Sequence, residues 1–335
     1  MVKVAINGFG RIGRLATRIL VGHPELELVA INSNGAVESS AHLFKYDSTY
    51  GVYQGKVETK ENLLIVDGHE IRYSREREPQ NLPWSDLSVD IVIDCTGKFT
   101  EKDQAALYKE VGAKKVLLSS PGKNEDVTLV MGVNENTYNA DEHFLISNAS
   151  CTTNCLAPVV KVLNESFGIE KGLMTTVHAY TNDQLVLDKS HRDLRRARAA
   201  ALSIILTTTG AAKSVSLVLP ELEGKLNGLA LRVPTPTVSV VDLVIETQKP
   251  VTKESVNEAF EKAAAGELKG ILDVTYDPVV SVDFTGNDYS AVIDAQLTMV
   301  MGENQVKVLA WYDNEWGYTR RLIEMAVYIA EKGLS

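Results

Sequence analysis

The sequence predicts an α/β protein in two parts: a doubly wound parallel sheet, then an α+β part with a mostly antiparallel sheet. Three observations favour this fold class. The chain has 335 residues, which suits two domains. Short apolar runs alternate with helical patterns over the first half, as in a parallel sheet covered by helices. After about residue 150, long β-rich segments replace this alternation.

The strands expected in the first half are short apolar runs bounded by turn residues, a pattern typical of buried parallel strands. They are Val2–Ile6, Leu26–Asn32, Ile91–Cys95, Lys115–Leu118 and Phe144–Ile146. Asp67-Gly68 predicts a hairpin turn between Leu63–Val66 and Glu70–Tyr73. Helical spacing of apolar residues predicts helices over Arg11–Val21, Ala41–Tyr46 and Gln104–Glu110.

The second half begins with a helical pattern from Cys151 to about Phe167. The β-rich segments that follow are Leu173–Ala179, Leu229–Ile245, Val279–Phe284, Ala291–Met301 and Gln305–Trp311. Further helices are expected over Lys253–Ala265 and Tyr318–Lys332. We therefore place a domain boundary near residue 149, and the sequence leaves open which domain the last helix joins.

Composition narrows the function classes. Charged residues make up 23% and hydrophobic residues 44% of the chain, which excludes long disorder, collagen and coiled coil. The net charge of -10 argues against a nucleic-acid binder, because phosphate backbones require a cationic face. Three cysteines are too few for a disulfide scaffold and suit a reducing compartment. With no signal-peptide pattern and no run near the ~20 apolar residues of a membrane span, we expect a cytoplasmic protein that does not bind membranes.

A glycine motif follows the first expected strand and opens the first helix. Gly8, Gly10 and Gly13 have the spacing G-x-G-x-x-G. These glycines allow a tight turn and let a pyrophosphate approach the backbone at the helix N-terminus. The alternative is a glycine-rich turn without a ligand. In this position, after a strand and before a helix, the motif predicts a Rossmann-type dinucleotide site.

The acid that usually accompanies this motif is missing. It is expected about 20 residues on, where it binds the adenosine ribose, but the second strand ends at Asn32-Ser33-Asn34-Gly35. Ser33 can donate to a phosphate oxygen, whereas an aspartate would repel one, so NADP is one interpretation. The other is that Ser33 is a loop residue and Asn32 holds the ribose of NAD. Spacing alone leaves both open.

Cys151 is the candidate nucleophile. It begins a helix, where the dipole is expected to stabilise a thiolate and lower the thiol pKa. Cys155 lies one turn further on the buried face, and Cys95 fits a buried strand. No other cysteines or histidines have metal-ligand spacing, so we expect no metal site.

A cysteine nucleophile requires a base, and His178, at the end of an expected strand, is favoured modestly over His191. A thiol beside a dinucleotide site suggests aldehyde oxidation through a thiohemiacetal and a thioester. Arginines then suggest anionic substrate groups. The candidates are Arg192, Arg195, Arg196, Arg198 and Arg232, of which Arg195 and Arg198 read as surface residues.

These residues lie in segments that together resemble phosphorylating glyceraldehyde-3-phosphate dehydrogenases. The segments are Ile6–Arg14, Ser147–Cys155, His178–Gln184, Asp193–Ala199, Thr208–Lys213, Leu231–Asp242 and Trp311–Tyr318. The resemblance spans essentially the whole chain. It implies a homotetramer that converts glyceraldehyde 3-phosphate, inorganic phosphate and NAD(P) to 1,3-bisphosphoglycerate, and the reverse. It also implies a dinucleotide-binding domain of residues 1–149 and 314–335, and a catalytic domain of residues 150–313.

The resemblance implies roles for individual residues. Cys151 forms the acyl enzyme, and His178 rather than His191 is its base. The residues implied to bind the substrate and inorganic phosphate are Ser150, Thr152, Thr181, Arg196, Thr209, Gly210 and Arg232. Of these, Thr181 and Arg232 would bind the substrate's own phosphate. The residues implied to bind the cofactor are the three glycines, Arg11, Ile12, Thr96, Ser119 and Asn314. Asn314 would hold the nicotinamide amide.

Two departures from the family pattern concern the cofactor. NAD-dependent members carry aspartate in place of Ser33, and often proline in place of Ser190. The photosynthetic, NADP-using members resemble this chain at both positions, and in them the arginine matching Arg77 helps to bind the 2′-phosphate. Ser190 would reach the cofactor of a neighbouring subunit. The resemblance therefore shifts the expectation towards NADP, with use of both cofactors as the expected compromise.

The sequence argues against two rival functions. Erythrose-4-phosphate dehydrogenase shares the cysteine segment but departs from Tyr180–Asp183 and Thr208–Lys213, both of which this chain keeps. A binding or scaffold protein without catalysis would be indicated by loss of the nucleophile or base, and Cys151 and His178 are both present.

Overall fold

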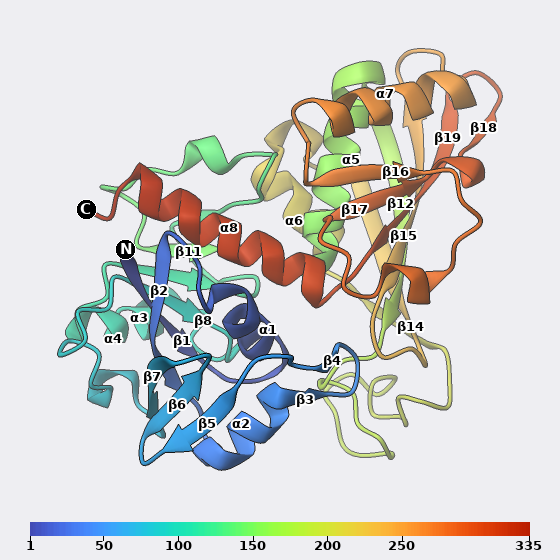
Figure 1. Ribbon diagram of the computed structural model, residues 1–335. Helices are drawn as coiled ribbons and strands as arrows, with labels where there is room; N and C mark the ends of the chain where they lie inside the picture. Colours follow the sequence, from blue (N-terminus) through green and yellow to red (C-terminus); the bar gives the residue numbers. More distant parts are fainter. The chain divides into compact units, whose positions relative to one another are not determined.

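The computed structural model describes residues 1–335 and divides into two compact units (Figure 1). The first comprises Met1–Val130, Glu135–Ala149 and Thr319–Ser335. The second comprises Met131–Asn134 and Ser150–Tyr318. These units differ from the predicted domains at residues 131–134 and 314–318, which group with the second unit. The assignment of functions to the two domains stays a prediction.

The first unit contains a nine-stranded sheet with the order β10-β11-β9-β8-β1-β2-β7-β6-β5. From β10 to β7 all neighbours are parallel, and β7-β6-β5 are antiparallel. The strands are β1 (Val2–Asn7), β2 (Leu26–Asn32), β5 (Val57–Lys60), β6 (Leu63–Val66), β7 (His69–Ser74), β8 (Ile91–Asp94), β9 (Lys115–Leu118), β10 (Val127–Thr128) and β11 (Leu145–Ser147). A small hairpin pairs β3 (Tyr46–Asp47) with β4 (Gly51–Val52). The predicted doubly wound sheet is confirmed.

Local sequence explains the first unit's turns and helices. Asp67 and Gly68 both have positive φ, as a two-residue hairpin turn requires. The helices are α1 (Arg11–Leu20), α2 (Val37–Lys45), α3 (Lys102–Ala105) and α4 (Leu107–Glu110), with 3₁₀ turns η1 (Pro79–Asn81) and η2 (Glu135–Thr137). Trp84 stacks on Tyr108 in a buried cluster that includes Val92 and Val116. This packing holds α4, which carries Tyr108, against β8 and β9, which carry Val92 and Val116.

The second unit contains an eight-stranded, mostly antiparallel sheet, which confirms the second part of the predicted fold class. Its order is β13-β14-β12-β15-β19-β17-β16, with β18 paired to β19. The strands are β12 (Ile169–Ala179), β13 (Ile205–Thr208), β14 (Leu226–Val233), β15 (Ser239–Thr247), β16 (Leu272–Thr275), β17 (Ala291–Asp294), β18 (Met299–Met301) and β19 (Gln305–Tyr312). Only the pairs β12–β14 and β16–β17 are parallel.

Helices cover one face of this second sheet (Figure 1). They are α5 (Cys151–Phe167), α6 (Ala211–Val218) and α7 (Lys253–Ala265), with the 3₁₀ turns η3 (Pro220–Leu222), η4 (Ser281–Phe284) and η5 (Ala295–Leu297). Helix α5 packs against β15, β17 and β19. The C-terminal helix α8 runs over Trp316–Lys332. No helix is long and apolar enough to cross a membrane.

Several expected elements differ from those observed. The single segment Leu229–Ile245 is two strands, β14 and β15, because Pro234 and Pro236 interrupt the ladder. Val279–Phe284 was expected to be β-rich, but Ser281–Phe284 is a 3₁₀ turn in which Asp283 accepts the backbone N–H of Val280. The segment Ala291–Met301 is broken by η5. The helix expected from Ala41 begins at Val37, and that of Gln104–Glu110 forms two short pieces.

Candidate active site

Cys151 is the first residue of α5, as the sequence predicts. Ser150 caps the helix, its Oγ accepting the backbone N–H of Thr153 at 3.0 Å. Ala149 turns the chain into the helix with φ of 55°. Thr152 lies 2.9 Å from the Tyr312 hydroxyl, which also lies 2.9 Å from Thr176. The cap and the tyrosine therefore fix the turn that carries the thiol.

His178 is the histidine that reaches Cys151. Its Nε2 lies 3.5 Å from Cys151 Sγ. The ring stands near the end of β12, and the parallel register pairs His178 with Arg232 of β14. Sheet pairing thus places His178 and Arg232 side by side, although 54 residues separate them in the sequence.

The other side of the imidazole is held by backbone. Nδ1 lies 2.7 Å from the carbonyl oxygen of Ala179, which also accepts a bond from Arg232 Nη1 at 2.9 Å. When Nδ1–H donates to Ala179, Nε2 is the acceptor that faces the thiol. Arg232 Nη1 also lies 2.9 Å from Nδ1. Burial, and then the charge of Arg232, lower the pKa of His178 to about 3. The ring is therefore neutral.

The thiol does not follow the expectation from helix position. Burial raises the pKa of Cys151, while the charge of Arg232 and hydrogen bonds from Thr152 act in the lowering direction. The prediction of a lowered thiol pKa is wrong, because the loss of hydration outweighs these stabilising groups.

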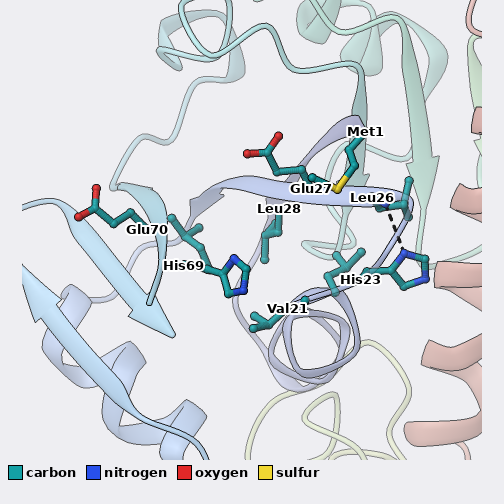
Figure 2. Close-up of a pocket in the computed structure, with 11 residues that line it drawn as sticks. Met1, Val21, His23, Leu26, Glu27, Leu28, His69 and Glu70 are labelled. Atoms are coloured by element: carbon teal, nitrogen blue, oxygen red, sulfur yellow. Dashed lines mark hydrogen bonds between the residues drawn. The ribbon is translucent and has the colours of Figure 1, made fainter. Parts of the chain in front are cut away.

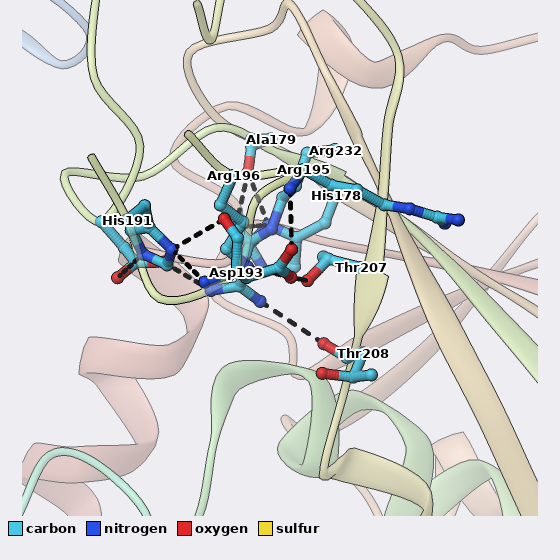
Figure 3. Close-up of polar contacts among 10 residues, drawn as sticks. His178, Ala179, His191, Asp193, Arg195, Arg196, Thr207, Thr208 and Arg232 are labelled. Carbon is cyan, nitrogen blue, oxygen red and sulfur yellow. Dashed lines mark hydrogen bonds and ion pairs between the residues drawn. The ribbon is translucent and has the colours of Figure 1, made fainter. Parts of the chain in front are cut away.

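A second cationic centre forms around Arg196 (Figure 3). Its Nη1 pairs with Asp183 at 2.5 Å, and its Nε donates to Thr207 Oγ1 at 2.8 Å. Thr207 in turn donates to Asp193. Burial acts to raise the pKa of Asp183, but hydrogen bonds from Arg196 and His191 outweigh it and the pKa is lowered. The guanidinium is therefore held in one orientation by ionised partners.

His191, the rival base, belongs to this second centre. Its Nδ1 accepts the backbone N–H of Asp193 at 2.9 Å, which leaves Nε2–H to donate to Asp183 at 3.3 Å. Neither nitrogen is bonded to Cys151. The geometry thus separates the two histidines that the sequence alone could hardly rank.

The remaining predicted anion-binding residues lie in loops and at a helix start of the second unit. Thr209 Oγ1 accepts the backbone N–H of Ala211, and Gly210 is the N-cap of α6. Thr181 follows β12 and is half-buried. The backbone N–H groups at the start of α6 can bind an oxyanion.

A buried serine joins Ala179, the residue after His178, to the predicted nicotinamide residue Asn314. Ser239 Oγ accepts the backbone N–H of Ala179 at 3.1 Å and donates to Asn314 Oδ1 at 2.9 Å. The Asn314 side-chain oxygen therefore accepts a hydrogen bond from Ser239, which fixes the orientation of the amide group. Ser239 was not predicted, since its role depends on strand pairing rather than on a motif.

The glycine turn has the shape of a dinucleotide site. Gly8 has φ of 98°, and a Cβ on Gly13 would lie 2.0 Å from the carbonyl oxygen of Gly8. Nothing lies within 4 Å of a Cβ built on Gly10, the N-cap of α1. The helix begins with Arg11 and Ile12, has no side-chain cap and carries no acid in its first turn. Its N-terminus is thus open to an anionic group.

Other predicted cofactor residues follow the carboxyl ends of neighbouring strands, where ligands bind in such sheets. Ser33 follows β2, and Thr96 follows β8 with its hydroxyl donated to Asp94 at 2.7 Å. Ser119 follows β9, its backbone N–H donated to the carbonyl of Asp94. Arg77 is exposed beyond β7, and Ser190 is exposed in a loop of the second unit. The side chain of Arg11 pairs with Asp47 at 2.6 Å.

The interpretation in which Asn32 holds the ribose conflicts with its contacts. Asn32 is only 5% exposed. Its Nδ2 donates to Asn7 Oδ1 and to the carbonyl of Glu76, each at 2.8 Å, and its Oδ1 accepts the backbone N–H of Glu76 at 2.9 Å. The polar atoms of its side chain are therefore all bonded to Asn7 and Glu76. The hydroxyl of Ser33, the next residue, accepts the backbone N–H of Gly35 at 3.5 Å.

A small pocket of the first unit is unrelated to these residues (Figure 2). It lies where β2 begins at Leu26 and β7 begins at His69, the opposite ends of the strands from Ser33. Its volume of about 110 Å³ is too small for a dinucleotide. No predicted site residue lines it, and no cluster of three or more metal-ligating side chains occurs in the chain.

A glycine turn on a parallel sheet and a cysteine–histidine pair on a second domain define a dinucleotide-dependent oxidoreductase with a thiol nucleophile. The comparisons identify the family. The model described as "Glyceraldehyde 3-phosphate dehydrogenase, NAD binding domain" matches residues 2–102, and its "C-terminal domain" matches residues 150–314. The chain belongs to the glyceraldehyde-3-phosphate dehydrogenase family, which confirms the resemblance read from the sequence.

Curated relatives match over 97% or more of this chain. A glyceraldehyde-3-phosphate dehydrogenase of Geobacillus stearothermophilus is 58% identical over 333 residues, covering 99% of each chain. The chloroplastic glyceraldehyde-3-phosphate dehydrogenase A of Zea mays is 57% identical, covering 97% of this chain and 81% of the relative. Glyceraldehyde-3-phosphate dehydrogenase 2 of Trichormus variabilis is 54% identical, covering 99% of each chain.

Proposed function

We propose that this protein oxidises glyceraldehyde 3-phosphate, in the presence of inorganic phosphate, to 1,3-bisphosphoglycerate, and catalyses the reverse reaction. The observation that carries the proposal is the 3.5 Å contact between Cys151 Sγ and His178 Nε2 at the start of α5. The names of the relatives from Geobacillus stearothermophilus and Bacillus subtilis support the substrate.

Each step uses groups of this chain. His178 takes the thiol proton as Cys151 Sγ adds to the aldehyde carbon, and it returns that proton to the former carbonyl oxygen, giving a thiohemiacetal. Bound NAD(P)⁺ supplies a hydride acceptor. His178 removes the hydroxyl proton as the hydride leaves, and a thioester remains on Cys151. Phosphate then attacks the thioester carbon and the thiolate leaves.

The two phosphate groups have separate candidate partners. Arg232 and Thr181 would bind the phosphate of the substrate. Ser150, Thr152, Arg196, Thr209 and Gly210 would serve the attacking phosphate. Two contacts support this division. Arg232 lies beside His178, whereas Arg196 is bonded to Thr207, 11 residues further along the sequence, in a separate network.

The decisive experiment is phosphate-dependent formation of NADH or NADPH from glyceraldehyde 3-phosphate by the purified protein. We expect one burst of reduced cofactor per site without phosphate and steady turnover with it. Preference for erythrose 4-phosphate, or no turnover by a folded protein with either cofactor, would contradict the proposal.

We also propose that the cofactor site accepts NADP as well as NAD, through Ser33, Arg77 and Ser190. Ser33 lies at the end of β2 without the usual acid. The match to the NAD binding domain model supports a nicotinamide cofactor. We assign the dinucleotide to residues 1–149 and 314–335 and the catalysis to residues 150–313.

Replacing Ser33 with aspartate is expected to weaken NADP binding about tenfold or more relative to NAD, because a carboxylate would face the 2′-phosphate. Calorimetric dissociation constants for both cofactors measure the ratio. Ser33→Ala serves as the control, since it removes the hydroxyl without adding charge. Equal weakening of both cofactors by the aspartate would refute the placement of Ser33.

A homotetramer is the proposed assembly. The loop of residues 186–204 exposes large apolar side chains, with Val186 82%, Leu194 81% and Leu202 80% exposed. Such side chains favour burial against another subunit. Light scattering of the purified protein tests the assembly. Three free cysteines support a reducing, cytoplasmic location.

Replacing Asp183 with asparagine is expected to raise the KM for inorganic phosphate by about tenfold, because Arg196 loses its charged partner and its fixed orientation. The burst of reduced cofactor measured without phosphate is expected to stay intact. Asp188→Asn is the matched control, since Asp188 pairs with the exposed Arg198. A lower KM for phosphate in Asp183→Asn would show that Asp183 only reduces the charge of Arg196.

A further inference from the structure

A buried hydrogen-bonded chain runs along the carboxyl ends of four neighbouring strands of the first sheet. Tyr108 donates to Asp94 at the end of β8, and Asn7 at the end of β1 contacts both. Asn7 accepts from Asn32 at the end of β2. Asn32 then bonds both backbone groups of Glu76, just beyond β7. These hydrogen bonds thus fix the loop around Glu76 relative to the strand ends.

The effect of Asn32 on that loop is specific. It holds the N–H and the carbonyl of Glu76 at the same time, so the backbone at this residue has one orientation. The carboxylate of Glu76 turns back to accept the N–H groups of Arg77 at 2.6 Å and Glu78 at 3.0 Å. Its negative charge is therefore partly satisfied within the loop.

Arg75 lies on the Ser33 turn. The parallel register pairs Asn32 with Ser74, and the backbone N–H of Ser33 donates to the carbonyl of Ser74 at 3.1 Å. The guanidinium of Arg75 reaches across, with Nη2 donating to the carbonyl of Asn34 at 3.4 Å. Strand pairing therefore brings a cation to the turn of Ser33 and Asn34, in which Ser33 stands in place of the usual ribose-binding acid.

We propose that Arg75 is a specificity-determining residue that binds the 2′-phosphate of NADP together with Ser33, and that Asn32 is the positioning residue for this loop. The proposal rests on the proposed use of NADP and adds two residues to it. A guanidinium offers several N–H donors to a phosphate, and the Ser33 hydroxyl can donate one more. Arg77, on the other side of Glu76, adds positive charge, but its backbone N–H donates to Glu76 and not to the Ser33 turn.

The test uses adenosine fragments, so that binding is measured without turnover. Calorimetry gives the dissociation constants of adenosine 2′,5′-bisphosphate and of 5′-AMP. The unmodified protein is expected to favour the bisphosphate. Arg75→Gln is expected to weaken the bisphosphate about tenfold to a hundredfold, the effect of losing a charged hydrogen bond, and to leave 5′-AMP nearly unchanged. Arg72→Gln is the control, because Arg72 is exposed on β7 and pairs in register with Ala30, two residues before the end of β2.

The outcomes separate the two proposals. If the unmodified protein favours the bisphosphate and Arg75→Gln behaves like Arg72→Gln, the inference about Arg75 is overturned while NADP use stands. If Arg77→Gln alone removes the preference, Arg77 is the phosphate residue and Arg75 is not. If the unmodified protein binds both fragments equally, the proposal of NADP use and the inference both fail.

Asn32→Ala tests the positioning role. The ratio of the two dissociation constants is expected to fall, because Arg75 loses its fixed position, whereas a merely structural loss would weaken both fragments alike. Circular dichroism checks that the variant folds. If it does not fold, Arg75→Gln and its control still decide the main point. An unchanged ratio in folded Asn32→Ala would overturn the positioning role.

Discussion

Replacing Cys151 with serine is expected to reduce turnover by on the order of 10⁴-fold or more, because an alcohol is a far weaker nucleophile than a thiol at this position. The burst of reduced cofactor should disappear, since no thiohemiacetal forms. Binding of NAD or NADP, measured by calorimetry, should be retained, because the glycine turn of the first unit is untouched. Retained turnover in this variant would overturn the assignment of the nucleophile.

Cys155 provides the matched control. It lies one helical turn further along α5, is fully buried, and its Sγ donates only to the carbonyl of Ala310. Cys155→Ser should keep the burst, and iodoacetamide should still modify a single site. Mass spectrometry of the labelled protein locates the modified residue. Labelling of Cys155 in preference to Cys151 would contradict the proposed site.

Replacing His178 with asparagine is expected to lower the rate of the burst by about 10²–10⁴-fold, the range for loss of a general base. Asparagine keeps a polar group near Ala179 and Arg232 but cannot accept the thiol proton. Rapid-mixing measurements at several pH values should show a rate that rises with pH as hydroxide replaces the base. A burst as fast as that of the unmodified protein would exclude His178 as the base.

His191 is the control for that experiment. It bonds Asp183 and the backbone of Asp193, and it has no contact with Cys151. His191→Asn should leave the burst nearly unchanged and affect only the phosphate-dependent step. A burst lost equally in both variants would mean that the structure does not separate the two histidines as described.

Local signals predicted some parts of the molecule closely. The expected helix from Cys151 to about Phe167 matches α5, because Ser150 is a good N-cap and apolar residues follow at helical spacing. The strand Leu26–Asn32 matches β2, and the glycine motif lies between β1 and α1 as expected. In these cases neighbouring residues along the chain carry the whole signal.

Other parts depend on contacts that the sequence pattern does not contain. The short strand β16 was missed, because it is defined by its parallel pairing with β17. Val238, at φ of 67°, occupies a conformation that a β-branched residue rarely adopts, inside a segment expected to be extended. Asp183 and Thr207 act on Arg196 only because a loop brings them together. The sequence therefore predicted the position of Cys151 at the start of α5 better than the groups that orient Arg196.

The parallel pairing of β12 with β14 has a consequence for folding. His178 and Arg232 become neighbours only when strands separated by residues 180–225 dock, and closing so long a segment delays the pairing. Helix α5 and the Ser150 cap need only local contacts. During refolding, the helical signal should therefore return before Cys151 regains its rapid reaction with an alkylating agent. The reactivity of Cys151, which depends on its contact with His178, would then measure the last step in the folding of this unit.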